Sequence, residues 1–202
     1  LLFLLTQLTQ LTAQNTPQHY FHTPANAGVN NSFFIDGFCN KFLFIYTQTE
    51  IAGMVNPVTS SITIDTIWFR HGGSSSNPNT TFTNLAVTMG HTTLAVPVAS
   101  FAANFNSGTP QVVLSAASYT YTPNTGAFGV PSDNWTAIVL QTPFVYNFTD
   151  NLAVQFEFTF SSSAIIGHYA DNGGIPITQY ATPSTSATAQ SITSRPMFVI
   201  SA

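Results

Sequence analysis

The clearest strand signal in the chain is Leu152-Ala153-Val154-Gln155-Phe156-Glu157-Phe158-Thr159-Phe160. Large apolar residues occupy every second position, and smaller or polar residues occupy the positions between them. A period of two is typical of a β-strand with one buried face. The pattern therefore predicts a strand over residues 152–160, with Glu157 pointing to solvent.

Residues 62–70 predict a second strand, with apolar side chains on both of its faces. A regular strand would place Ile62, Ile64 and Trp68 on one side, and Asp65, Ile67 and Phe69 on the other. Strands that are contacted on both faces are typical of the inside of a sheet. We therefore expect this strand to be central in its sheet.

Further short segments rich in β-branched and aromatic residues are separated by clusters of Gly, Pro, Asn and Ser. We predict strands at residues 42–47, 85–89, 93–98, 112–116, 119–122, 135–141, 165–169 and 197–200. About nine or ten short strands with this punctuation predict an all-β fold, an antiparallel β-sandwich that is jelly-roll-like. We divide the chain into an apolar N-terminal extension with coil, residues 1–29, and a single β-sandwich domain, residues 30–202.

The chain carries very little charge for its length. Its 202 residues include three Lys and Arg and seven Asp and Glu, which is 5% of the chain, and the net charge is −4. An ordinary domain has about 25% charged residues. Three basic residues are too few to neutralise the phosphates of a nucleic acid, and no apolar run reaches the roughly 18 residues of a membrane-spanning helix. Weak repulsion between copies favours self-association.

The sequence lacks the residue patterns that are typical of enzymes and metal sites. It contains no G-x-S-x-G, no Gly-rich phosphate loop and no H-E-x-x-H, and its acidic residues are spread singly. The pair His19-x-x-His22 offers two metal ligands without an obvious third. Calcium is a weak alternative, through the loop oxygens of Asp150-Asn151 and Asp171-Asn172. We therefore predict no catalytic residue, no metal site and no cofactor.

Three smaller features have a structural and a functional interpretation. The single cysteine, Cys39, cannot form an internal disulfide, and we interpret it as a buried thiol rather than an intermolecular bridge. Trp68 and Trp135 could form a sugar-binding platform, but their apolar strand patterns favour packing in the core. Four N-x-[ST] sequons are weak glycosylation candidates, because a chain rich in Asn, Ser and Thr contains such motifs by chance: Asn30, Asn79, Asn134 and Asn147.

Residues 1–14 read Leu-Leu-Phe-Leu-Leu-Thr-Gln-Leu-Thr-Gln-Leu-Thr-Ala-Gln. Five leucines have the i, i+3, i+4, i+7 spacing of one helical face: Leu1, Leu4, Leu5, Leu8 and Leu11. One interpretation is the apolar part of a secretory signal that is removed near Ala13. The other is a retained segment, whose leucines would be buried against a neighbouring copy of the chain.

Several motifs follow one another in an order that resembles a known kind of domain. They are Asn30-Asn31-Ser32-Phe33-Phe34, Asn40-Lys41-Phe42-Leu43-Phe44-Ile45-Tyr46 leading to Glu50-Ile51, Ile64-Asp65-Thr66-Ile67-Trp68-Phe69-Arg70, residues 81–92, residues 140–146 and Asn151-Leu152-Ala153-Val154. Their order resembles a β-sandwich domain that recurs in secreted and cell-surface proteins of Bacteroidota, many of them exported by the type IX route. The resemblance implies a noncatalytic adhesive or structural module, with no active-site residues.

Together these observations favour a structural protein over an enzyme. Our main hypothesis is a secreted subunit, extracellular or at the cell surface, that assembles into a filament, tube or surface layer. Its partners would be other copies of itself, with Leu1, Leu4, Leu5, Leu8 and Leu11 of one copy buried against the next, in a head-to-tail contact that yields open polymers. The alternative is a carbohydrate-binding or adhesive module of a cell-surface protein, with surface glycans as partners.

Overall fold

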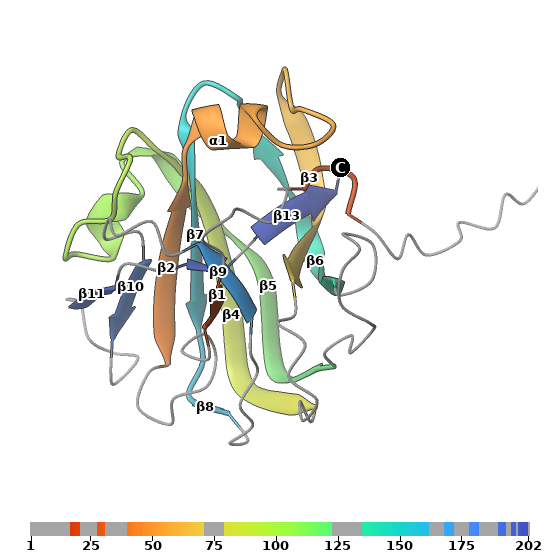
Figure 1. The fold of residues 1–202 in the computed structure, drawn as a ribbon. Helices are drawn as coiled ribbons and strands as arrows, with labels where there is room; N and C mark the ends of the chain where they lie inside the picture. The colour runs from red at the N-terminus through yellow and green to blue at the C-terminus, as the bar shows by residue number, and fades with distance from the viewer. Residues whose placement is uncertain are drawn as a thin grey trace, which may run out of the picture.

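The computed structural model describes residues 17–20, 28–30, 40–70, 79–122, 135–161, 168–171, 178–181, 190–192, 195–196 and 198–201. These residues form an all-β fold in which the strands pair antiparallel, as the sequence predicts (Figure 1). The described ranges contain thirteen strands, several of them only two to four residues long. The predicted number of about nine or ten strands is therefore not confirmed.

The strands belong to three sheets. The largest has the order β11(Gln190–Ile192), β10(Thr178–Ala181), β2(Lys41–Tyr46), β7(Asn151–Glu157), β4(Thr80–Thr92) and β5(Ser107–Tyr121), and β8(Phe160–Ser161) also pairs with β4. The second sheet has the order β13(Phe198–Ser201), β3(Ile62–Arg70) and β6(Trp135–Tyr146). The third has the order β1(Gly28–Asn30), β9(His168–Asp171) and β12(Arg195–Pro196).

Strand β7 contributes to the core as its alternating sequence predicts. Leu152, Val154 and Phe156 are fully buried in the main apolar cluster, to which β2, β4 and β5 of the same sheet also contribute. Strands β3, β6 and β13 of the second sheet contribute to the same cluster. Phe69 of β3 lies edge-on to Phe156 of β7, with ring centroids 5.5 Å apart. Side chains of the seven-stranded sheet and of the β13-β3-β6 sheet therefore share one core. We call these two the larger sheets, because their strands contain more residues than those of the β1-β9-β12 sheet.

Strand β3 has the predicted bounds and lies between β13 and β6, so it is central in its sheet as expected. The predicted assignment of its faces is wrong, because the register with β6 shifts between Ile64 and Thr66. This irregularity brings Ile64 and Ile67, which a regular strand would place on opposite sides, into the same core cluster. Trp68 lies in a separate cluster outside that core.

The predicted strand at residues 93–98 is wrong. Residues 93–106, here called the strap, are irregular apart from the short 3-10 helix η1(Ala102–Asn104). Asparagine side chains bind backbone groups that a strand would have paired: Asn104 Oδ1 accepts from Val98 N at 2.8 Å, and Asn106 Oδ1 accepts from Thr93 N at 2.8 Å. This local bonding competes with strand formation, although residues 93–98 contain β-branched side chains.

The strap packs on the far side of the large sheet from the main core. Its Phe101 is buried with Leu43 and Ile45 of β2 in a second apolar cluster, and Phe105 packs against the same cluster. Gly90 of β4 leaves room for this contact, because a Cβ built there would lie 2.6 Å from Phe105 Cδ1. Strand β2 is therefore buried on both faces.

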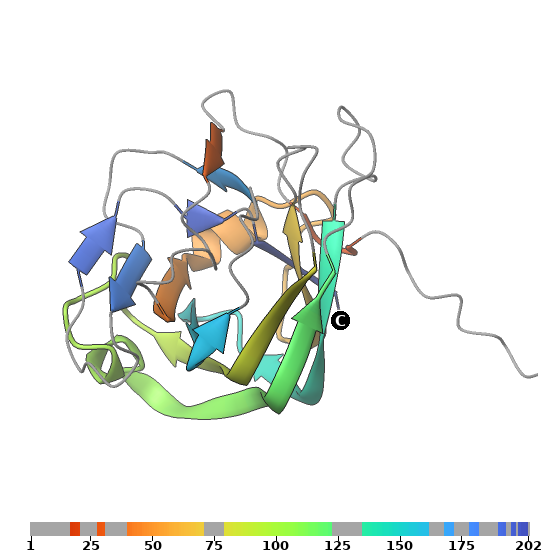
Figure 2. The same ribbon diagram turned by 90° about the horizontal axis from the view of Figure 1, so that it is seen from below.

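The edge strands of the two larger sheets meet at β5 and β6, which lie side by side in both ribbon views (Figure 2). Gln141 Oε1 accepts a hydrogen bond from Ser115 N at 2.9 Å, and Gln111 Nε2 donates to Pro143 O at 3.2 Å. Gln141 and Pro143 belong to the part of β6 that is displaced by the register shift opposite Asp65. The irregularity thus provides the contacts that join the two sheets.

The other predicted strands occur with shifted bounds. The segments 112–116 and 119–122 are parts of one strand, β5, and the segments 85–89 and 135–141 extend into the longer β4 and β6. The segment 42–47 corresponds to β2, and 152–160 corresponds to β7, which ends at Glu157, with Phe160 in the separate strand β8. Residues 168–169 and 198–200 of the last two predicted strands belong to β9 and β13, and residues 165–167 and 197 lie outside the described residues. The helix α1(Gln48–Ala52) was not expected, although Thr47 and Glu50 form a reciprocal capping box at its start.

Candidate interaction surface

The predicted interface residues Leu1, Leu4, Leu5, Leu8 and Leu11 lie outside the described residues, as do Cys39 and His22. The described chain begins at Pro17, and residues 17–20 attach to the second sheet. His19 and Ile200 of β13 exchange two backbone hydrogen bonds, of 3.0 and 3.2 Å. Tyr20 and Val55 exchange two more, of 3.4 and 2.7 Å. Residues 17–20 therefore extend this sheet beside β13.

Side chains reinforce this attachment. Gln18 N donates to Ser201 Oγ at 3.2 Å, and Asn56 Nδ2 donates to Gln18 O at 3.0 Å. His19 is buried and its Nδ1 is in contact with Asn56 O. A carbonyl oxygen only accepts, so Nδ1 carries the proton and donates to it. In the part of the chain that the structure describes, no group of three or more His, Cys, Asp or Glu side chains could hold a metal ion.

The two tryptophans pack on the outer face of the second sheet, the face turned away from the main core. Trp68 and Trp135 are both buried in one small cluster, where Tyr20 and Ala137 pack against them. The Tyr20 and Trp135 ring centroids are 6.4 Å apart, and Trp68 Nε1 donates to Ser201 Oγ at 3.0 Å. The prediction that these tryptophans pack rather than form an exposed platform is confirmed.

Farther along β6, the same outer face is open to solvent. Val139 is 64% exposed and Val145 is 58% exposed, and their cross-strand partners in β3 are Thr66 and Thr63. We call Val139, Val145, Thr63 and Thr66 the valine strip. The outer face of β6 thus changes along the strand, from a covered tryptophan at residue 135 to exposed valines at residues 139 and 145.

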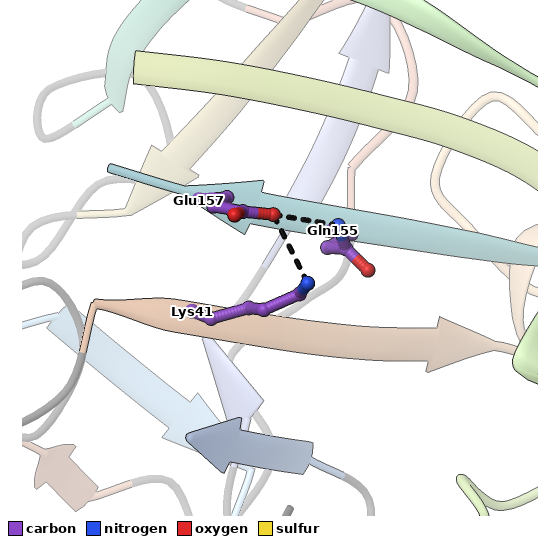
Figure 3. Close-up of polar contacts among 3 residues, drawn as sticks. All are labelled: Lys41, Gln155 and Glu157. Atoms are coloured by element: carbon purple, nitrogen blue, oxygen red, sulfur yellow. Dashed lines mark hydrogen bonds and ion pairs between the residues drawn. The ribbon is translucent and has the colours of Figure 1, made fainter. Parts of the chain in front are cut away.

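A small polar cluster lies on the outer face of the large sheet (Figure 3). Lys41 of β2 and Glu157 of β7 are cross-strand partners, and Lys41 Nζ is 3.1 Å from Glu157 Oε2. Gln155 Nε2 donates to the same carboxylate at 3.5 Å, and Lys41 Nζ lies 4.9 Å from the ring centroid of Phe101. The Glu157 side chain is 36% exposed and points away from the core, as predicted. The only lysine of the chain is therefore engaged in cross-strand pairing and in a contact with the strap.

A second polar cluster surrounds the turn between β6 and β7. His91 Nε2 accepts a hydrogen bond from Asn147 N at 3.1 Å, and Asp150 Oδ2 accepts from Ser107 Oγ and Asn147 Nδ2, both at 2.8 Å. Burial lowers the pKa of His91, and the nearby Asp150 carboxylate opposes this effect. Hydrogen bonds from Asn147 and Ser107 lower the pKa of Asp150. Ser107 and Asn147 both donate to the Asp150 carboxylate, so these hydrogen bonds join the start of β5 to the turn between β6 and β7.

The asparagines of three of the four sequons fall within the described residues. Asn30 ends β1, Asn79 is exposed just before β4, and Asn147 donates its side-chain amide to Asp150; Asn134 lies outside the described residues. The proposed calcium ligands Asp150 and Asn151 are hydrogen-bonded to protein groups, since Asn151 Oδ1 accepts from Gln48 N at 2.7 Å. Asp171 ends β9, and Asn172 lies outside the described residues. Glycosylation at these positions stays a prediction.

Among the described residues, no helix is both long enough and apolar enough to cross a membrane.

In comparisons with known proteins, the chain matches no family model, no curated protein and no solved structure.

Proposed function

We propose that this protein is a secreted structural subunit, extracellular or at the cell surface, that assembles with copies of itself through Leu1, Leu4, Leu5, Leu8 and Leu11. The observation that carries the proposal is the attachment of residues 17–20 beside β13. This attachment brings the chain to the edge of a sheet directly after the leucine-bearing segment. A segment tethered at a sheet edge is well placed to contact a neighbouring molecule.

The low charge of the chain and the burial of its tryptophans support this proposal over the alternative. Seven acidic and three basic residues provide little repulsion between copies. A carbohydrate-binding module would need exposed aromatic rings for stacking on sugars, and both tryptophans are buried in a cluster with Tyr20. Self-association therefore uses features that the chain has, whereas the two buried tryptophans are not available for stacking on a sugar.

We also propose that the two larger sheets form a β-sandwich with jelly-roll-like topology. The shared core and the contact between Phe69 and Phe156 support a face-to-face arrangement. In such a domain the outer faces and the edges of the sheets are the surfaces that remain for assembly.

The proposed function is tested by changing the leucines in the full chain. Leu4→Gln with Leu8→Gln removes two apolar side chains from the predicted helical face. We expect the concentration that is needed for assembly, measured by sedimentation velocity and electron microscopy, to rise by more than about tenfold. The matched control is Thr6→Gln with Gln10→Thr, which exchanges residues on the opposite side of the predicted helix and should leave assembly unchanged.

A deletion and a mass measurement complete this test. Deleting residues 1–13 should give monomers, so filaments formed by the truncated protein would overturn the mechanism. The mass of the secreted protein shows whether the segment is retained. If the mature protein lacks residues 1–13 and still assembles, the leucines are part of a signal and the proposal fails.

A further inference from the structure

We propose that the turn between β6 and β7, residues 147–150, is a pH-sensitive latch that His91 holds closed at neutral pH and releases in acid. The turn lies at the end of the large sheet where α1 also lies, and Gln48 N of α1 donates to Asn151 Oδ1 there at 2.7 Å (Figure 1). None of the residues of the latch belongs to the leucine-bearing segment, so the latch is separate from the proposed function.

His91 connects the turn to β4. It lies near the end of that strand, opposite Ser107 of β5 and Leu152 of β7. Its Nε2 accepts a hydrogen bond from Asn147 N at 3.1 Å, and a backbone N–H group only donates. Both nitrogens of a protonated imidazole carry hydrogen, so no rotation of the ring restores an acceptor. Protonation of His91 therefore breaks the link between β4 and the turn.

The backbone of the turn is strained. Phe148 has a φ of 61°, in the left-handed region that a bulky side chain rarely adopts. Next to it, Asn147 Oδ1 accepts from Thr149 N at 3.0 Å and from Asp150 N at 3.1 Å. A strained conformation persists only where the surrounding contacts fix it. Loss of the bond from Asn147 N to His91 therefore favours an open turn.

Two ionisable side chains in the described part of the chain lie next to His91. Asp150 Oδ2 accepts from Ser107 Oγ and Asn147 Nδ2, both at 2.8 Å, and these hydrogen bonds lower the pKa of Asp150. The Tyr146 ring centroid lies 6.0 Å from that of His91, and burial raises the pKa of this tyrosine, which stays neutral. His91 is therefore the group of the latch that changes charge first as the pH falls below neutrality.

The latch opens in two stages because Asp150 titrates later than His91. Protonated His91 is attracted by the Asp150 carboxylate, which draws the ring towards that carboxylate and away from Asn147 N. The hydrogen bond from Ser107 to Asp150 still attaches the turn to β5 at this stage. Acid therefore releases the turn from β4 first, and from β5 only when Asp150 is protonated.

Hydrogen exchange followed by mass spectrometry tests the latch in the full chain. The readout is the exchange rate of the amides of residues 147–150, corrected for the intrinsic effect of pH. We expect this rate to rise at least about tenfold from about pH 7.5 to about pH 4.5, whereas the amides of residues 152–157 in β7 should change less than about twofold. An equal rise in both segments would mean that the whole fold is weakened, and would overturn the proposal.

Two variants assign the effect to its residues. His91→Gln keeps a side-chain acceptor but binds no proton at these pH values, so the rise at residues 147–150 should shrink to less than about twofold. Ser107→Ala removes the attachment to β5, so its rise should exceed that of the wild type. Circular dichroism at neutral pH verifies that both variants are folded. A rise that persists in His91→Gln would overturn the role of His91.

A measurement on the wild-type chain covers the case in which His91→Gln does not fold. The midpoint of the rise in exchange at residues 147–150 should coincide with the pKa of His91, measured by an NMR titration of its imidazole. A midpoint more than about one pH unit below that pKa would assign the release to Asp150 and overturn the proposal.

Discussion

At the scale of single residues, His91 shows how one side chain joins several elements. It lies near the end of β4, with its ring 5.1 Å from that of Phe144 and 6.0 Å from that of Tyr146 in β6. The backbone N–H of Asn147 only donates, so His91 Nε2 must accept and the ring must be neutral there. Protonation of Nε2 would replace this acceptor with a donor that faces another donor.

His91 makes the stability of the protein depend on pH. Burial lowers the pKa of His91 below its ordinary value of 6.5, so the unfolded chain binds this proton more readily than the folded chain. The stabilisation is present above pH 6.5 and is lost as the pH falls through the lowered pKa. We expect the free energy of unfolding to decrease from about pH 8 to about pH 5, and His91→Gln to remove this part of the decrease. Urea denaturation at each pH measures it.

Asp150 provides the control for this prediction. Its carboxylate raises the pKa of His91, so Asp150→Asn should move the pKa of His91 lower still, as measured by an NMR titration of the imidazole. The pKa of Asp150 itself is lowered from 3.8, so its own contribution is lost only at more acidic pH. A rise in the pKa of His91 in Asp150→Asn would contradict the proposed balance of burial and charge.

At the scale of elements, the sequence predicts best where the period is regular and each strand has one role. The alternation from Leu152 onward correctly predicts β7 and its core face, although Ala153 on the other face is buried as well, in the cluster with Phe101. In β3 the bounds are correct, but a register irregularity at Asp65 places Ile64 and Ile67 on the same face and Trp68 on the other. The local alternation of residues 62–70 does not indicate that irregularity, which involves residues of β6 far away in the sequence. The residues Thr47-Gln48-Thr49-Glu50 have the spacing of a capping box, which is a sequence signal for a helix start. The helix that follows has only five residues, which is too short for the helical period of apolar residues to be recognised.

The strap is held by the side chain of one buried asparagine. Asn104 is fully buried, and its side chain accepts from Val98 N at 2.8 Å and donates to the carbonyls of Val98 and Ser100 at 3.0 and 2.8 Å. Asn104→Ala would leave these backbone groups without their partner, so we expect a loss of about 1–3 kcal/mol in the free energy of unfolding. Chemical denaturation measures the loss.

The control for the strap is Ser100→Ala. Ser100 is exposed, and its Oγ accepts only a long hydrogen bond of 3.4 Å from Ala103 N, so we expect a change of less than about 0.5 kcal/mol. Equal losses in the two variants would mean that the bonds of Asn104 do not hold the strap. In that case the aromatic contacts of Phe101 and Phe105 would be sufficient to fix it.

At the scale of the whole molecule, composition and patterning predict the all-β class, whereas the arrangement of the sheets depends on contacts between residues far apart in the sequence. The link from Gln141 to Ser115 and the attachment of His19 to Ile200 have no local signature in the sequence. The exposed valines on β6 were likewise not predicted, because alternation shows that one face is outward but not whether another segment covers it. The leucine positions and the resemblance to a Bacteroidota domain stay predictions.

The small number of charged residues in the whole chain determines how an assembly should respond to salt and to temperature. With three Lys and Arg and seven Asp and Glu, an assembly built on the leucines of the N-terminal segment should depend on apolar burial rather than on ion pairs. Raising NaCl from about 0.1 M to about 1 M shortens the Debye length from about 10 Å to about 3 Å, and should change the assembled fraction little. Cooling from about 25 °C towards freezing should dissolve part of the assembly, because apolar burial weakens in the cold. Sedimentation at each condition measures both effects, and an assembly that dissolves in salt but survives cooling would show that charges hold the copies together.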